Sequence, residues 1–197
     1  SGNFAQALSL AAKSLNVPAY IVMPSSAPQV KKDAVKTYGG KITECPPTLK
    51  DREETAQKIV DEKGATFVHP SNDIEVILGQ GTAALELLQK KPNLDIIITP
   101  VGGGGLIAGT ALAVSLFSEN TKTIGAEPFE VDDAYRSLIS GKIETNESTN
   151  TISDGLKTQL GDQNFPIIQE HVEEIIRVTE EEIKNALKLI WERIKIV

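Results

Sequence analysis

The sequence predicts an α/β fold with parallel strands, because helical and strand patterns alternate along the chain. Apolar residues recur at helical spacing from Phe4 to Leu15, and the apolar run Ala19–Met23 that follows is typical of a buried strand. Helical stretches of about ten residues or more separate the predicted strands, and connections of that length join parallel neighbours. The composition, 40% hydrophobic and 24% charged over 197 residues, is that of a globular protein.

The other elements follow in the same alternation. Further helices are predicted over Pro28–Tyr38, Asp51–Lys63, residues 74–90 and Leu106–Phe117, and further strands over Lys41–Thr43, Thr66–His69, Asp95–Val101 and Thr123–Ala126. Glycines follow two of these helices, Gly39-Gly40 after the first and Gly64 after the second, where a left-handed residue commonly ends a helix. The polar stretch Thr145–Thr151 is predicted to be an exposed loop.

Charge, cysteine content and hydropathy exclude several classes of protein. The net charge of −7, without a basic block, argues against a nucleic-acid surface. The single cysteine, Cys45, forms no internal disulfide and fits a reducing compartment such as the cytoplasm. The uncharged segment Ile96–Ser118 is long enough to span a membrane, but Pro100 and four glycines would break such a helix, so we expect a strand, a loop and a helix there.

Both ends of the sequence are expected to lie inside a larger domain. Ser1-Gly2-Asn3 opens directly into a helical pattern without a preceding strand. The helical periodicity of Glu180–Val197 continues to the last residue without the Gly, Asn or Pro that usually ends a helix.

The run Gly102–Gly105 is the strongest candidate for a ligand site. It follows the β-branched strand Ile96-Ile97-Ile98 and precedes a helix, so its backbone N–H groups and the helix dipole favour an anion such as phosphate. The alternative is a flexible turn, at the entropic cost of four glycines. A nucleotide P-loop is excluded because no Gly-Lys-Ser/Thr follows. A dinucleotide site stays open, since Gly103, Gly105 and Ala108 fit Gly-x-Gly-x-x-Ala, with Glu127 ending the next strand.

Three stretches, in this order and spacing, resemble signature segments of the fold-type II pyridoxal-phosphate enzymes. They are Ser1–Gln6, Gly79-Gln80-Gly81-Thr82 and Pro100–Gly105. The unbroken tetraglycine is similar to the serine racemase and threonine dehydratase branch, whereas cysteine synthases usually have a threonine or serine in this loop. The resemblance covers the whole chain and implies a tryptophan-synthase-β-like fold of three-layer parallel-sheet domains. We expect part of a small α/β domain over residues 1–70 and part of a large one over residues 71–197.

The resemblance also assigns roles to individual residues. Backbone N–H groups of Gly102, Gly103, Gly104, Gly105 and Leu106 would hold the phosphate of pyridoxal 5′-phosphate, and the Gly155 backbone would contact the ring or the substrate. Asn3 would hydrogen-bond the 3′ oxygen of the ring. Ser1 would face the substrate α-carbon opposite the cofactor lysine, so that one group removes a proton and the other returns one. From the residues alone, Ser1 and Asn3 could equally cap a helix, and Gly155 could be part of a turn.

An acidic cluster, Glu127 with Asp132 and Asp133, follows the strand at Thr123–Ala126. Grouped oxygen ligands suit Mg²⁺ or Ca²⁺, although acidic residues also gather at helix N-termini. Eukaryotic serine racemases resemble this chain here, which implies Glu127, Asp133 and the Val131 carbonyl as ligands of Mg²⁺, Ca²⁺ or Mn²⁺.

The resemblance thus implies a cytoplasmic, homodimeric serine racemase that is also an L-serine/L-threonine ammonia-lyase, with ATP as a candidate effector. Tyr38 and Arg52 match positions linked to nucleotide binding and substrate gating, although both types are common on surfaces. Two departures weaken the match: Phe4 replaces the usual histidine, and no lysine has the Ser-Phe-Lys setting of the Schiff-base lysine, so this chain alone should be inactive. A threonine dehydratase without racemase activity, a dinucleotide-binding protein and a non-catalytic relative stay open.

Overall fold

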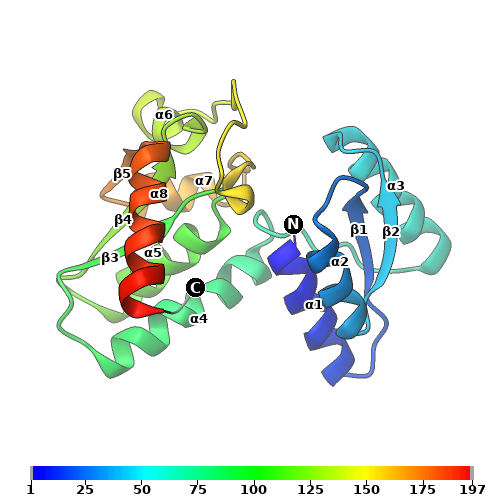
Figure 1. Cartoon of the computed structure of the whole chain (residues 1–197). Helices are drawn as coiled ribbons and strands as arrows, with labels where there is room; N and C mark the ends of the chain where they lie inside the picture. Colours follow the sequence, from blue (N-terminus) through cyan, green and yellow to red (C-terminus); the bar gives the residue numbers. More distant parts are fainter. Residues whose placement is uncertain (1, 196–197) are drawn as a thin grey trace. The chain divides into compact units, whose positions relative to one another are not determined.

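The computed structural model describes residues 2–195, except for the side chain of Leu49. The chain divides into two compact units, with the boundary between Val68 and His69 (Figure 1). Alternating helices and parallel strands build each unit, so the predicted α/β class is confirmed.

The first unit contains two parallel strands and three helices. In chain order these are α1 (Gly2–Ser14), β1 (Tyr20–Pro24), α2 (Gln29–Thr37), β2 (Lys41–Cys45) and α3 (Leu49–Lys63). Strands β1 and β2 pair in parallel from Tyr20↔Lys41 to Pro24↔Cys45. The small apolar core combines alanines of α1 with Ile21, Met23 and Val35, while Thr48 caps the start of α3 and Gly64 ends it with φ of 61°.

The prediction of a strand at Thr66–His69 was wrong, because this segment has no strand partner. His69 instead turns the chain: its Nδ1 accepts hydrogen bonds from the backbone N–H groups of Ser71 (3.2 Å) and Asn72 (2.8 Å). The β-branched and aromatic composition predicted a strand, but composition does not supply a neighbouring strand.

The second unit carries a parallel sheet in the order β3-β4-β5. Its elements are α4 (Ile74–Lys90), β3 (Ile96–Pro100), α5 (Gly105–Phe117), β4 (Lys122–Pro128), α6 (Asp133–Ser140), a 3₁₀ turn (Asp154–Leu156), α7 (Phe165–His171), β5 (Glu174–Val178), α8 (Glu180–Leu189) and a π-helical segment (Ile190–Ile194). Sequence patterns missed α7 and β5, which are short. Of the predicted helix over Glu180–Val197, residues 196 and 197 lie outside the described part of the chain.

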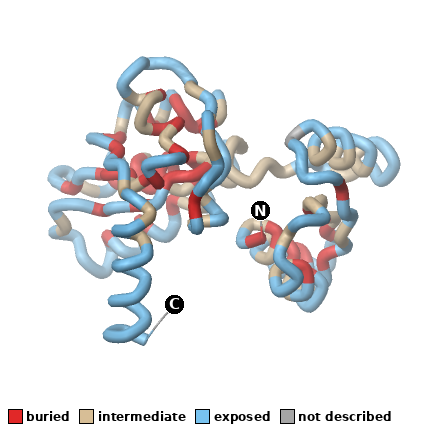
Figure 2. The backbone as a smooth tube through the Cα atoms, turned by 45° about the horizontal axis from the view of Figure 1, so that its top comes forward, coloured by how far each residue is buried: buried red, intermediate tan, exposed pale blue. Residues whose placement is uncertain are grey.

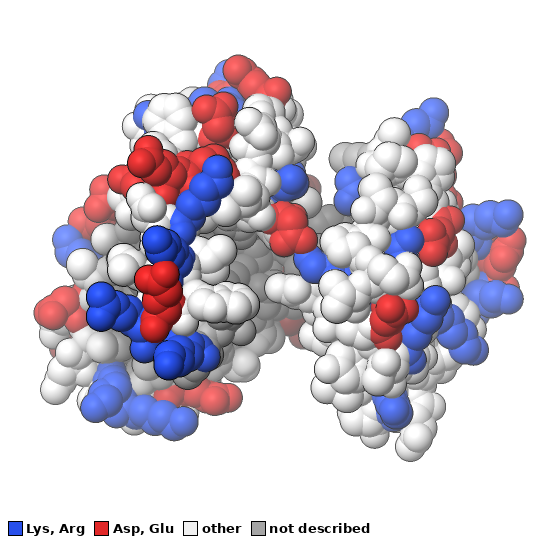
Figure 3. Space-filling view, in the orientation of Figure 1, with Lys and Arg blue, Asp and Glu red and all other residues white. Residues whose placement is uncertain are grey.

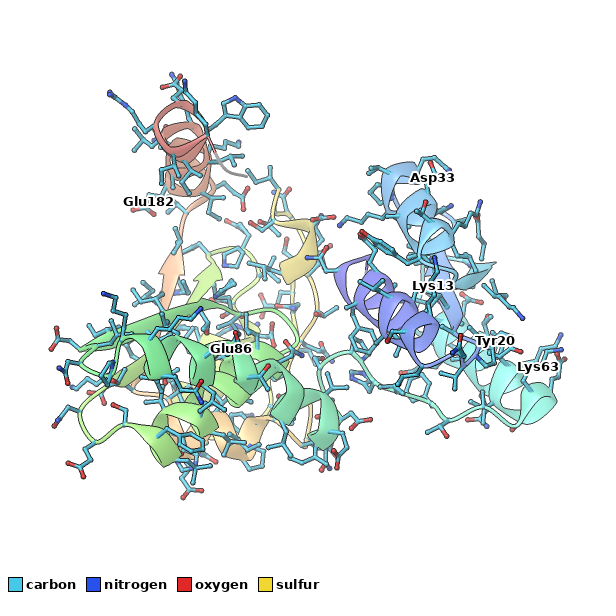
Figure 4. The ribbon with its side chains drawn as sticks, turned by 90° about the horizontal axis from the view of Figure 1, so that it is seen from below. Lys13, Tyr20, Asp33, Lys63, Glu86 and Glu182 are labelled. Carbon is cyan, nitrogen blue, oxygen red and sulfur yellow. The ribbon has the colours of Figure 1, made fainter. Side chains whose placement is uncertain are left out.

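Helix α5 is the centre of this unit. Ile107, Ala108 and Ala111 of α5 join Ile77, Val101, Ile168 and Ile175 in the main core. Figure 2 shows the buried residues gathered inside the units, whereas α8 has no buried residue. Helix α8 begins instead with a capping box, in which Thr179 and Glu182 exchange hydrogen bonds; Glu182 is labelled in Figure 4.

The surface carries charged side chains of both signs. Acidic and basic side chains are interspersed over the face of the molecule shown in Figure 3. Within residues 2–195, no helix is both long and apolar enough to cross a membrane.

Candidate cofactor and cation sites

The glycine run forms the connection between β3 and the start of α5. Val101 continues the pairing of β3, because its N–H donates to the Ala126 carbonyl at 2.9 Å. Gly104 is the N-cap of α5 with φ of 84°, a left-handed conformation that glycine adopts without strain. The first N–H groups of a helix lack intrahelical acceptors and carry the positive end of its dipole. The loop can therefore bind an anion.

Close neighbours explain why the loop residues lack side chains. A methyl group built on Gly102 would lie 3.0 Å from the Gly155 carbonyl and from Leu156 Cα. One built on Gly103 would collide with the Ser71 hydroxyl, and one on Gly105 would lie 2.6 Å from Gln80 Nε2. The structure thus brings Gly155, one of the predicted cofactor contacts, against the glycine loop.

Sequence reasoning missed the polar side chains that surround this loop. Ser71 and Thr158 place hydroxyls beside Gly103, Gln80 places its amide beside Gly105, and Asn164 lies behind Gly104. Gln80 belongs to the Gly79–Thr82 motif, so a signal existed for it. Ser71, Thr158 and Asn164 come from turns and loops far from the glycines in sequence, and no periodic pattern marks them.

Glu127, at the end of β4, is a buried carboxylate with 1% of its surface exposed. Its Oε1 accepts from the Ala134 N–H at 3.2 Å, and its Oε2 accepts from the Tyr135 N–H at 2.9 Å. Burial raises the pKa of Glu127 to about 8, against the lowering effect of these hydrogen bonds and with a further increase from the charge of Asp133.

Asp133 begins α6 and is fully buried. Its Oδ2 accepts from the Leu160 N–H at 2.9 Å, whereas its Oδ1 has no hydrogen-bond partner in the described part of the chain. Burial raises the pKa of Asp133 to about 6. The Asn146 amide lies beside this carboxylate and lowers its pKa, but the Asn146 polar atoms are also buried without hydrogen-bond geometry to any described residue.

Unpartnered buried polar atoms of this kind are suited to bind a cation or an ordered water. Buried carboxylates are normally paired, and an unsatisfied buried oxygen is costly. Among residues 2–195, no three His, Cys, Asp or Glu side chains are grouped to hold a metal ion. The predicted set needs only two carboxylates, Glu127 and Asp133, together with the carbonyl of Val131, which is itself fully buried.

Asp132 has a different role from Asp133, because two arginines neutralise it. Arg136 Nε donates to its Oδ1 at 2.7 Å, and Arg177 Nη1 donates to its Oδ2 at 3.1 Å. The Arg177 guanidinium also lies over the rings of Tyr135 (4.2 Å) and Phe129 (4.5 Å). Asp132 thus fastens the segment after β4 to α6 and β5.

The remaining predicted site residues are placed as follows. Asn3 is exposed in the first turn of α1, and helix α1 begins before it, so Asn3 does not cap this helix. Leu106 is half-buried in the first turn of α5, and Phe4 is half-buried in α1. Ser1 lies outside the described residues. Asn3 belongs to the first unit and the glycine loop to the second.

The dinucleotide alternative required Glu127 to hold a ribose. Both of its carboxylate oxygens instead accept hydrogen bonds from the first turn of α6 inside the core. The geometry therefore gives no support to a nucleotide at this carboxylate.

Comparisons with known proteins point to one family. The curated serine racemase of Dictyostelium discoideum is 48% identical over 199 residues, covering 100% of this chain and 61% of the relative. The β-hydroxyaspartate dehydratase of Paracoccus denitrificans is 47% identical over 197 residues, and the match covers 100% of this chain and 62% of the relative. This chain therefore spans about three fifths of the length of these relatives.

Solved structures agree with the sequence matches. The crystal structure of the Dictyostelium discoideum serine racemase has a TM-score of 0.92 at 47% identity, covering 100% of this chain and 64% of that one. The crystal structure of a threonine deaminase from T.th. has a TM-score of 0.93 at 42% identity, and the match covers 99% of this chain and 65% of that one. The family model described as "Pyridoxal-phosphate dependent enzyme" matches residues 1–197. The chain belongs to the family of pyridoxal-phosphate dependent enzymes.

Proposed function

We propose that this chain supplies the phosphate and cation sites of a pyridoxal-phosphate-dependent serine racemase that also acts as an L-serine and L-threonine ammonia-lyase. The observation that carries the proposal is the tetraglycine loop between β3 and α5, with Gly104 left-handed at the helix start. Similarity to serine racemases and to a threonine deaminase over essentially the whole chain supports the choice of substrate class.

The cofactor would be held through backbone groups of the second unit. Gly102 to Gly105 and Leu106 would donate their N–H groups to the phosphate, and Gly155, which packs against Gly102, would lie beside the ring or substrate. Asn3 would donate its amide to the 3′ oxygen of the ring. When bound, pyridoxal phosphate withdraws electrons from the substrate α-carbon and so eases the loss of its proton.

Two groups on opposite faces of the α-carbon are needed for racemisation. Ser1 would hold or move the proton on one face, and the family's cofactor lysine would do so on the other. No lysine of this chain has the sequence setting of that residue, so the activity is proposed for the full-length protein. Loss of the β-hydroxyl after loss of the α-proton would give an aminoacrylate from serine, and its hydrolysis by water would release pyruvate and ammonia.

A divalent cation, Mg²⁺ or else Ca²⁺ or Mn²⁺, would bind between Glu127, Asp133 and the Val131 carbonyl, with waters completing the shell. The unpartnered Asp133 Oδ1 and the buried Asn146 amide beside it support this proposal. The cation would stabilise the ionised forms of the two buried carboxylates and so rigidify the segment from β4 to α6.

Further properties complete the proposal. The protein would be a cytoplasmic homodimer, and ATP would be an effector that binds near Tyr38, with Arg52 taking part in substrate gating. Tyr38 is half-buried at the C-cap of α2, and Arg52 Nε donates to the Thr48 carbonyl at the start of α3.

A second candidate is dehydration without racemisation, either of threonine or of β-hydroxyaspartate. The relative from Paracoccus denitrificans, a β-hydroxyaspartate dehydratase, is 47% identical, against 48% for the Dictyostelium discoideum serine racemase and 46% for that of Arabidopsis thaliana. Phe4, at the position where histidine is usual, changes the polarity beside Asn3 and so bears on substrate preference.

The test uses the full-length protein with pyridoxal phosphate, Mg²⁺ and, in turn, L-serine, L-threonine and erythro-β-hydroxyaspartate, followed by chiral separation and a 2-oxo-acid assay. D-Serine together with pyruvate supports the proposal. In that case Ser1→Ala should reduce the rate of D-serine formation by a larger factor than the rate of pyruvate formation. A 2-oxo acid without any D-amino acid supports the dehydratase candidate. No product from any substrate contradicts both.

A further inference from the structure

Asn164, the residue before α7, ties the glycine loop to two other segments. Its side chain is fully buried. Its Nδ2 donates to the carbonyls of Gly103 and Ser71, each at 2.8 Å, and its Oδ1 accepts from the Gly161 N–H at 3.1 Å. Gly103 lies 61 residues and Ser71 lies 93 residues before Asn164 in the sequence. The Asn164 side-chain amide thus uses both of its donor hydrogens and its acceptor oxygen to join three parts of the chain.

This set of partners specifies asparagine. An aspartate has the same shape but no donor when ionised, and serine or threonine offers one donor only. The partners also fix the orientation of the amide, because two carbonyl oxygens must face the nitrogen and one N–H must face the oxygen.

The bond to Gly103 controls the direction of the next N–H group. In a planar trans peptide, the carbonyl of one residue and the N–H of the next point in opposite directions. Asn164 draws the Gly103 carbonyl toward the interior, so the Gly104 N–H points the other way, out of the loop. Without this bond, the Gly103 carbonyl would be free to turn toward the place where the loop binds an anion. The partial negative charge of the carbonyl oxygen would then repel the anion.

Packing reinforces the same geometry. A methyl group on Gly104 would lie 2.7 Å from Asn164 Oδ1, so the side chain of Asn164 sits directly against the left-handed Gly104. Asn164 also holds the Ser71 carbonyl, and Ser71 leaves no room for a side chain on Gly103 or Gly105. Asn164 and Ser71 together therefore restrict the loop.

We propose that Asn164 is a positioning residue for the phosphate site: it orients the Gly103–Gly104 peptide so that the loop presents N–H groups, and no carbonyl, to the cofactor phosphate. This inference rests on the proposed function, since it needs the phosphate to bind at Gly102–Gly105. Asn164 itself does not touch the cofactor.

The test compares the affinities of the full-length apo-protein for pyridoxal 5′-phosphate and for pyridoxal, which lacks the phosphate, by absorbance titration. Asn164→Asp removes both donors at constant shape, and Asn164→Ser retains one donor. Ile168→Val, at a fully buried position inside α7, is the control, because the isoleucine side chain makes no hydrogen bond to the loop. Thermal melts check that each variant is folded.

Asn164→Asp should weaken binding of pyridoxal phosphate by roughly tenfold or more, the effect of one hydrogen bond to a charged group, and leave pyridoxal binding unchanged. Asn164→Ser should give a smaller loss of the same kind, and it serves as the test if the aspartate variant does not fold. Equal losses for both ligands, or no loss, would show that Asn164 is a general structural residue. If the unaltered protein does not prefer pyridoxal phosphate over pyridoxal, the phosphate site itself is wrong, and the proposed function fails with it.

Discussion

At the scale of single residues, burial decides the protonation of two carboxylates, Glu127 at the end of β4 and Asp133 at the start of α6. Glu127 and Asp133 are almost completely buried, and burial raises the pKa of the first to about 8 and of the second to about 6. The sequence predicted an acidic cluster, but not which carboxylates would be buried. Asp132 differs from Asp133 because it meets two arginines, one of which arrives from β5, and such a long-range partner has no local signature.

The stability of the cation-free protein should therefore fall as pH rises. The usual pKa of Glu127, 4.5, applies to the unfolded chain, so between about pH 4.5 and about pH 8 the folded protein retains a proton that the unfolded chain has lost. In that window the free energy of unfolding should decrease by up to about 1.4 kcal/mol per pH unit from this group. Urea unfolding in a chelator, at several pH values across the window, measures the slope.

Glu127→Gln is the matching variant, because it cannot ionise. Its free energy of unfolding should depend less on pH across the same window, whatever its absolute stability, while Asp133 still contributes a slope up to about pH 6. Parallel pH profiles for Glu127→Gln and the unaltered protein would show that Glu127 is ionised in the fold without a cation.

At the scale of elements, the glycine run predicted the connection between β3 and α5. The residues that pack against this run, which come from distant parts of the sequence, were not predicted. The strand, glycine run and helix at residues 96–117 were predicted almost to the residue, because periodicity and the β-branched run are local. Helix α7 and strand β5 were missed because they are short, and the false strand at Thr66–His69 shows that composition cannot supply a pairing partner.

Helices α4 and α5 cross at two glycines, Gly81 and Gly109. A methyl group on Gly81 would lie 2.6 Å from the Gly109 carbonyl oxygen, and one on Gly109 would collide with the Ile77 carbonyl. Gly109→Ala should therefore lower the free energy of unfolding by about 1–3 kcal/mol, since backbone atoms must move apart.

Gly79→Ala is the matched control, in α4 two residues before Gly81. A methyl group there meets nothing within 4 Å, so alanine should stabilise the helix by up to about 1 kcal/mol. Chemical denaturation of both variants tests the pair; similar effects of the two substitutions would contradict a close helix crossing.

At the scale of the whole molecule, the β3-β4-β5 sheet has one covered face and a second face on which the outer strands β3 and β5 expose isoleucines, while Ile124 of the central strand is 8% exposed. Ile97 and Ile175 are buried under α5 and its neighbours, whereas Ile96, Ile98 and Ile176 alternate to the other face and are 45%, 58% and 39% exposed. Parallel sheets are normally covered on both faces, and the three-layer architecture expected from the sequence requires such a cover.

A protein made of residues 1–197 alone should therefore bind a hydrophobic dye and self-associate. Ile98→Thr, which retains β-branching while reducing the apolar surface, should lower both dye fluorescence and the associated fraction in analytical ultracentrifugation without loss of stability. Ile97→Thr, on the buried face, is the control and should destabilise the fold instead. Equal behaviour of the two variants would contradict the assignment of faces.

The central claim is that the glycine loop at the start of α5 binds the phosphate of pyridoxal phosphate, and a crystal structure of the full-length protein with the cofactor tests it most directly. We expect the phosphate oxygens to lie at about 2.7–3.2 Å from backbone nitrogens of Gly102 to Leu106, with the Gly103 carbonyl still bound by Asn164. A phosphate bound at another segment, or a loop whose carbonyls face the phosphate, would contradict the claim.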